Sequence, residues 1–223
     1  MKYRFLFVFY LTTALVLILS LVGTFFNYKK FRLFVILFSK NMETVLKLFQ
    51  INIKVVNSHL IHDNGYLYAS KHQSIFETIY FNRLFYNPAY ILKKELLNIP
   101  LFGMYLKKLG MIAIDRSQGI HSLRYVNEQT AKYVENRPVI IFPEGTRTEF
   151  LDQPDLKPGI YSMYKSLNKP VIPIAINSGY SWPKNNKIRK GTITVELKDP
   201  IPPGLSKIDF LNKLKFEINT LNR

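Results

Sequence analysis

The sequence predicts the α/β fold class: a largely parallel sheet flanked by helices, with an additional apolar helix near the amino terminus. Two observations predict it. Short apolar runs alternate with helical stretches from Ile51 onward, and an uncharged apolar segment covers Phe5–Tyr28. The length of 223 residues suits one such domain with an accessory element. We therefore expect residues 1–50 to form a membrane anchor and an interfacial helix, and residues 51–223 to form one domain.

The first apolar segment is long enough to cross a membrane. Phe5–Tyr28 contains no Lys, Arg, His, Asp or Glu, and as a helix it would span a hydrocarbon core of about 30 Å. A cleaved signal peptide is the alternative, because Lys2 and Arg4 provide a basic start. The apolar run exceeds the usual signal core and no clear cleavage site precedes Lys29, so we favour an uncleaved anchor. The basic residues after the segment favour a cytoplasmic location for the part of the chain that follows it. The alternative is a shallow hairpin with the next helix, which would place both ends on one side of the membrane.

The composition is strongly basic and contains no cysteine. A net charge of +16, from 31 Lys and Arg against 15 Asp and Glu, suits a nucleic acid, an anionic lipid surface or a phosphorylated substrate. The apolar segment, and the spread of the basic residues along the chain, favour anionic membrane lipids as partners and no nucleic acid. The absence of cysteine excludes disulfides, thiolate metal sites and a cysteine nucleophile.

The stretch after the apolar segment predicts an amphipathic helix. Its apolar residues recur at three- and four-residue spacing, and they are Phe31, Phe34, Val35, Phe38, Met42, Val45, Leu46 and Phe49. Such a stripe either packs against the protein core or lies in the membrane interface, and the sequence leaves both interpretations open.

The remaining chain predicts strands and helices in alternation. The expected strands are Ile51–Val56, Tyr66–Ser70, Tyr90–Leu92, Met111–Asp115, Val139–Phe142, Val171–Asn177 and Thr192–Leu197. The expected helices are Ile75–Phe85, Pro100–Leu109, Ser122–Glu135, Gly159–Leu167 and Ile208–Leu221. This alternation is typical of a parallel sheet covered on both faces, in which ligands bind at the carboxyl ends of the strands.

His72 lies in the segment KHQSIFET, just after the strand that ends at Ser70, so we expect its imidazole at a strand end. A general base belongs at such a place. Glu77 could accept the Nδ1 proton of His72 if His72 lies in the turn and Glu77 in the first helical turn. Two alternatives stay open: His72 as a structural histidine, and Glu77 as the capping-box partner of the Ser74 backbone amide.

Other catalytic groups are poorly supported. The chain has no Gly-x-Ser-x-Gly elbow, which argues against a hydrolytic serine. His72 and Glu77 lack a clear third ligand at metal spacing. We therefore expect no metal and a direct transfer to an activated hydroxyl.

Two arginines follow strands at the same expected sheet edge. Arg116 ends the segment GMIAIDR, and Arg147 lies in FPEGTRT. Guanidinium groups bind phosphate monoesters with paired donors and permanent charge, so two such arginines in a basic chain favour phosphate binding. The alternative for each arginine is an ion pair with Asp115 or Glu144. Gly145 would let the backbone turn tightly beside a ligand.

Four segments in this order resemble the glycerolipid acyltransferase family, and within it the 1-acylglycerol-3-phosphate acyltransferases. They are KHQSIFE at Lys71–Glu77, GMIAIDR at Gly110–Arg116, FPEGTR at Phe142–Arg147 and VIPIAIN at Val171–Asn177. The first motif of the family is Asn-His, four residues, then Asp, so Lys71 and Glu77 depart from it. Ala113 stands where many members have Phe. The resemblance covers about Ile51 to Ile201, the length of a compact domain.

This resemblance implies a reaction and assigns residues to it. His72 would take the proton from the 2-hydroxyl of lysophosphatidic acid as that oxygen attacks an acyl thioester, with Glu77 as the partner of His72. The implied substrate-binding positions are Arg116, Glu144, Gly145, Thr146 and Arg147, with the arginines on the glycerol phosphate. The donor would be acyl-CoA or acyl carrier protein, with no metal and no bound organic cofactor.

The resemblance also implies a place in the cell. The product, phosphatidic acid, belongs to phospholipid biosynthesis, and we expect residues 51–223 to form a catalytic domain on the cytoplasmic face of a bacterial inner membrane. Two alternatives stay open. One is an acyltransferase for another lysolipid or for glycerol 3-phosphate, and the other is a membrane-tethered binder of anionic ligands without catalysis.

Overall fold

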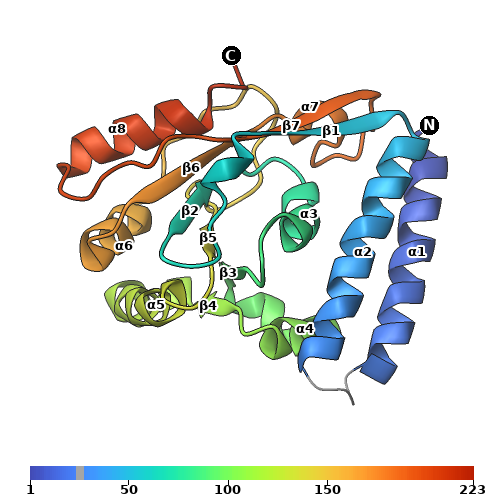
Figure 1. Cartoon of the computed structure of the whole chain (residues 1–223), viewed down its shortest axis with the longest axis horizontal. Coiled ribbons are helices and arrows are strands. Elements are labelled where there is room, and N and C mark those ends of the chain that lie inside the picture. The colour runs from blue at the N-terminus through green and yellow to red at the C-terminus, as the bar shows by residue number, and fades with distance from the viewer. Residues whose placement is uncertain (24–27) are drawn as a thin grey trace.

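A seven-stranded sheet forms the centre of the computed structural model, which describes residues 1–23 and 28–223 (Figure 1). The strands are β1 (Ile51–Val56), β2 (Leu67–Ser70), β3 (Ala89–Lys93), β4 (Ile112–Ile114), β5 (Val139–Ile141), β6 (Val171–Ile176) and β7 (Gly191–Leu197). Their order is β1-β7-β6-β2-β5-β3-β4, and β6 and β7 are the antiparallel neighbours. The other neighbours are parallel, so the expected largely parallel α/β fold is confirmed.

Helices cover both faces of this sheet (Figure 1). One face carries α1 (Lys2–Gly23), α2 (Tyr28–Leu48) and α3 (Phe76–Leu84). The other carries α5 (Gly119–Val134), α6 (Gly159–Leu167) and α8 (Lys207–Ile218). The connections contain the short helices α4 (Phe102–Lys108) and α7 (Ser178–Ser181) and the 3-10 turns η1 (Ser58–Leu60), η2 (Lys94–Asn98) and η3 (Arg116–Gln118). The expected strands and helices are thus present, with ends that differ by at most three residues.

Side chains alternate along the central strands and fill two cores. Leu67 of β2 and Val139 of β5 lie in the core under α5, α6 and α8. The next residues, Tyr68 and Ile140, lie in the core under α2 and α3. All four side chains are fully buried. Strands that are covered on both faces need apolar residues at every position, which explains the uninterrupted apolar runs in the sequence.

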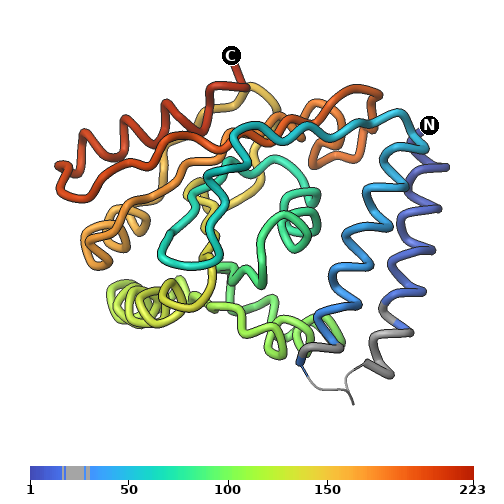
Figure 2. The backbone as a smooth tube through the Cα atoms, viewed as in Figure 1, coloured from blue at the N-terminus to red at the C-terminus, as the bar shows by residue number. Residues whose placement is uncertain are grey.

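The first two helices lie side by side on the same side of the sheet as α3, and we call them the helical hairpin (Figure 2). In α1, Phe5 and Phe9 pack against Trp182, with ring centroids 4.9 and 5.1 Å apart. In α2, the buried residues are Phe31, Ser39, Met42, Val45 and Leu46. The amphipathic helix therefore packs against the core with these residues, and its interfacial location stays a prediction.

The expected membrane-spanning helix is not supported. Among residues 1–23 and 28–223, no helix has the length and apolarity needed to cross a bilayer. Within the expected segment 5–28, helix α1 ends at Gly23, and residues 24–27 lie outside the described residues. The apolar residues Phe5 and Phe9 of α1 are instead used for packing on the protein core. The division of the chain at Ile51 stays a prediction.

Candidate active site

His72 lies in the turn after β2, at the carboxyl end of the sheet. Its ring stacks on Phe142, with centroids 4.0 Å apart and planes inclined by 20°. Phe142 directly follows β5, the parallel neighbour of β2, so the strand order brings the two rings together. The His72 side chain is 15% exposed, which leaves part of the ring open to a reactant. The expected strand-end location of His72 is therefore confirmed.

Glu77 lies in the first turn of α3 and is fully buried. Its Oε2 lies 3.4 Å from Nδ1 of His72 and also accepts the backbone N–H of Ser74 at 3.0 Å. Its Oε1 accepts the hydroxyl of Ser178 and, more weakly, the backbone N–H of Gln73 at 3.4 Å. The two interpretations of Glu77 do not exclude one another, because one oxygen caps the helix and faces His72.

The surroundings of the two ring nitrogens of His72 favour one neutral tautomer. Its Nδ1 is buried and has no aligned hydrogen bond in the described part of the chain, and the Glu77 carboxylate faces it. A carboxylate beside Nδ1 favours the tautomer that carries a proton on this nitrogen and leaves Nε2 as the basic nitrogen. The same charge would stabilise an imidazolium.

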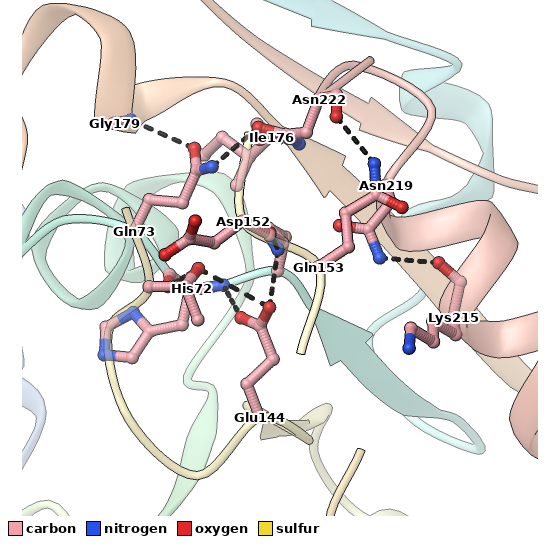
Figure 3. Close-up of polar contacts among 12 residues, drawn as sticks. His72, Gln73, Glu144, Asp152, Gln153, Ile176, Gly179, Lys215, Asn219 and Asn222 are labelled. Atoms are coloured by element: carbon pink, nitrogen blue, oxygen red, sulfur yellow. Dashed lines mark hydrogen bonds and ion pairs between the residues drawn. The ribbon is translucent and has the colours of Figure 1, made fainter. Parts of the chain in front are cut away.

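Glu144 lies three residues beyond β5 and has its carboxylate turned into the protein (Figure 3). Oε1 lies 2.6 Å from Nζ of Lys71, and Oε2 accepts the backbone N–H of His72 at 3.0 Å. Burial raises the pKa of Glu144, and the charge of Lys71 opposes this rise. Because protein donors occupy both oxygens, these contacts do not favour the predicted role of Glu144 as a substrate ligand.

Gly145 and Arg116 meet beside this carboxylate. Gly145 has φ +72°, and a Cβ atom there would lie 3.2 Å from Nη2 of Arg116 and 3.2 Å from Cγ of Lys157. The same Nη2 donates to the Gly145 carbonyl at 3.0 Å. A side chain at position 145 would therefore strain the backbone and displace the arginine.

Neither arginine forms the ion pair that was its alternative interpretation. Asp115 binds Ser117 and Lys94, whose hydrogen bonds lower its pKa, and Glu144 binds Lys71. In the described part of the chain, Arg116 and Arg147 have no carboxylate partner. Both guanidinium groups therefore keep an uncompensated charge.

The rest of the site divides into exposed predicted residues and residues that motif reasoning missed. Thr146 and Arg147 are exposed on the loop after β5, and their substrate-binding roles stay predictions. Lys71 and Ser178 were missed, although Lys71 directly follows the buried strand β2 and Ser178 lies two residues after the buried strand β6. Among residues 1–23 and 28–223, no three His, Asp or Glu side chains gather to hold a metal ion.

Comparison of the sequence with known proteins gives consistent matches. Residues 52–177, more than half of the chain, match the profile of the family described as Acyltransferase. A 1-acyl-sn-glycerol-3-phosphate acyltransferase of Pseudomonas aeruginosa is 39% identical over 128 residues, which cover 56% of this chain and 50% of that protein. One from Helicobacter pylori is 44% identical over 86 residues, covering 36% of this chain and 35% of that protein. The chain thus spans about half or less of the length of these curated relatives.

The fold is similar to a solved structure. The crystal structure of the 1-acyl-sn-glycerophosphate (LPA) acyltransferase PlsC from Thermotoga maritima matches with a TM-score of 0.79. The match covers 99% of this chain and 95% of that one, at 19% sequence identity. At this identity the likeness concerns the fold.

Proposed function

Because this chain belongs to the acyltransferase family, we propose that it transfers an acyl group from a thioester to the 2-hydroxyl of 1-acylglycerol 3-phosphate. The product would be phosphatidic acid. The observation that carries the proposal is the buried Glu77 carboxylate facing Nδ1 of a partly exposed His72 at a strand end. Matches to 1-acyl-sn-glycerol-3-phosphate acyltransferases support the choice of acceptor.

The proposed chemistry begins at Nε2 of His72. This nitrogen takes the proton of the acceptor hydroxyl while the oxygen attacks the thioester carbonyl, and Glu77 stabilises the imidazolium. When the tetrahedral intermediate collapses, the carbon–sulfur bond breaks and the ester forms. His72 then returns its proton to the departing thiolate. The proton of the acceptor hydroxyl thus leaves with the thiol. The acyl donor is acyl-CoA or acyl carrier protein.

Arg116 and Arg147 would bind the phosphate of the acceptor. Arg116 begins η3 just after β4, and Arg147 lies in the loop after β5, so both are at the carboxyl ends of strands, as His72 is. Neither charge is paired with a carboxylate among the described residues. A permanent cation with paired donors suits a phosphate monoester. Gly145, with its positive φ, and the exposed Thr146 precede Arg147 in the same loop. Their backbone N–H groups and the Thr146 hydroxyl would add neutral donors to the phosphate.

We infer that the helical hairpin seats the protein on a membrane. Its outward side carries exposed apolar residues, namely Tyr3, Phe7, Tyr10, Leu11, Leu15, Ile18, Leu33 and Leu37. Apolar residues of this density on a strongly basic protein are typical of helices that lie in the interface of an anionic bilayer. The cytoplasmic face of a bacterial inner membrane would give access to thioester donors.

The test is acyl transfer by the purified chain in vesicles. The panel offers lysophosphatidic acid, other lysolipids and glycerol 3-phosphate, each with acyl-CoA and with acyl carrier protein. We expect transfer to lysophosphatidic acid, and a loss of about 10²–10⁴-fold in rate in His72→Ala, because a positioned base is removed. His121→Ala, at an exposed histidine of α5, is the matched control. A wild-type rate in His72→Ala would contradict the mechanism. A preference for another acceptor in the panel would identify that acceptor as the substrate in place of lysophosphatidic acid.

A further inference from the structure

Lys71 and Glu144 form an ion pair that is closed off from solvent. Nζ of Lys71 lies 2.6 Å from Oε1 of Glu144, and both side chains are 0% exposed. Moving two ionised groups out of water costs several kcal/mol each, and their attraction often fails to offset this cost. The pair is therefore not explained by stability alone, and its other contacts indicate what it does.

The pair is linked to the backbone of His72. The second oxygen of Glu144, Oε2, accepts the His72 N–H at 3.0 Å (Figure 3). The His72 carbonyl accepts the backbone N–H of Thr148 at 2.8 Å and the Thr148 hydroxyl at 3.1 Å. Both polar backbone groups of His72 are thus held by the loop 144–148, which follows β5.

Lys71 fixes this loop at a second point. Its Nζ also donates to the backbone carbonyl of Asp152, which lies further along the loop. Its backbone N–H bonds the carbonyl of Ile174 in β6 at 3.0 Å, so the residue itself is anchored in the sheet. Lys71 and Glu144 are 73 positions apart in the chain. The ammonium therefore sets the separation between the turn that carries His72 and the loop that follows β5.

We propose that Lys71 and Glu144 are positioning residues that hold His72 in its stacked place on Phe142, and that Glu144 does not bind the acceptor. The inference rests on the proposed acyl transfer through His72. An acceptor hydroxyl could bind Glu144 only by displacing Lys71 or the His72 amide. Either displacement would move His72 from its place.

The test compares Glu144→Gln, Lys71→Met and the double variant in the full chain in vesicles. We expect each single variant to lower kcat by up to about 100-fold, because a small displacement of a catalytic group costs that much. The KM for lysophosphatidic acid should change by less than about twofold, since no substrate contact is removed. The double variant leaves no unpaired buried charge, so it should recover part of the kcat lost in Lys71→Met.

The exposed pair Lys169–Glu135 provides the matched control. Nζ of Lys169 also lies 2.6 Å from a carboxylate oxygen, but this pair is on the surface, and its residues precede β6 and β5, whereas His72 follows β2. Lys169→Met should leave kcat and KM at their wild-type values. Thermal unfolding of all variants separates a displaced base from a protein that has failed to fold.

Histidine NMR on the same variants reports the position of the ring without turnover. The chain has four histidines, and the His72 signals are assigned with His72→Ala. We expect the His72 ring resonances to shift in both single variants and to return toward their wild-type positions in the double variant. The resonances of His59, His62 and His121 should stay unchanged.

These measurements separate the two proposals. A raised KM for lysophosphatidic acid with unchanged kcat in Glu144→Gln would overturn the positioning role. Wild-type kcat and wild-type His72 resonances in all three variants would overturn it as well. If the wild-type protein acylates no lysolipid while the His72 resonances follow the expected order, the proposed function fails and the positioning of His72 stands.

Discussion

At the scale of single residues, Glu77 combines a structural and a chemical contact in one oxygen. Oε2 caps α3 through the Ser74 amide and faces Nδ1 of His72, while Oε1 accepts from Ser178. An amide in the same place can accept the same Ser74 bond and donate to Ser178, but it carries no charge. The two contributions can therefore be separated by one substitution.

We expect Glu77→Gln to lower kcat by about 10²–10⁴-fold, because the imidazolium loses its counter-charge. The free energy of unfolding should change by less than about 1 kcal/mol, since the cap survives. Acyl-transfer kinetics and denaturant unfolding of the same preparation measure the two quantities. Unchanged turnover would assign Glu77 to the cap alone.

Arg147 offers a second prediction at this scale. In Arg147→Lys we expect the KM for lysophosphatidic acid to rise about tenfold, because a lysine lacks the paired donors and a charge-assisted bond contributes about 1.5–3 kcal/mol. The KM for the acyl donor should stay the same. Arg124→Lys, on the exposed side of α5, is the control. Equal effects on both substrates would contradict phosphate binding by Arg147.

At the scale of elements, α1 has two faces with different environments. Phe5 is fully buried against Trp182, whereas Phe7, two positions on, is 68% exposed. The same residue type thus packs in the core at one position and points outward at the other. A comparison of the two positions separates protein stability from membrane binding.

We expect Phe5→Ala to lower the free energy of unfolding by about 3–5 kcal/mol, as for a large aromatic side chain removed from a core. Phe7→Ala should leave unfolding unchanged and weaken binding to anionic vesicles, because it removes apolar area from the interface. Thermal unfolding and vesicle sedimentation are the measurements. Vesicle binding that is unaffected by Phe7→Ala would contradict the proposed seating of the hairpin.

At the scale of the whole molecule, a buried amide network joins the segment after α8 to the turn that carries His72 (Figure 3). Nε2 of Gln73 donates to Oδ1 of Asn222 at 2.6 Å, and Nδ2 of Asn222 donates to the Ile176 carbonyl at 2.9 Å. The Gln73 carbonyl oxygen Oε1 accepts the Gly179 N–H at 3.0 Å. A hydrogen bond between residues 149 positions apart therefore helps to hold the turn that carries His72.

We expect Asn222→Ala to destabilise the fold and to slow acyl transfer together. It removes the partner of the buried Nε2 of Gln73 and the side-chain donor to the Ile176 carbonyl, at about 1–3 kcal/mol for each group. Thermal unfolding and kcat are the measurements, with the exposed Asn185→Ala as control. Wild-type stability in Asn222→Ala would show that the network contributes nothing.

The sequence by itself determined the order of the elements and the place of His72. Uninterrupted apolar runs mark β5 and β6, because strands covered on both faces are apolar at nearly every position. Parallel strands bring the polar residues that follow them to one edge of the sheet, so His72 could be placed there without coordinates. Both predictions depend on local patterns, because a few consecutive residues determine whether a strand forms and where it ends.

The tertiary structure alone decided which groups became partners. The hydrophobic effect has no direction, so the apolar α1 does not reveal from its sequence that Phe5 and Phe9 pack against Trp182. A carboxylate pairs with whichever cation the fold brings within about 4 Å. For this reason the sequence could offer only an arginine as an alternative partner of Glu144, whereas the strand order brings Lys71 to it from 73 positions away.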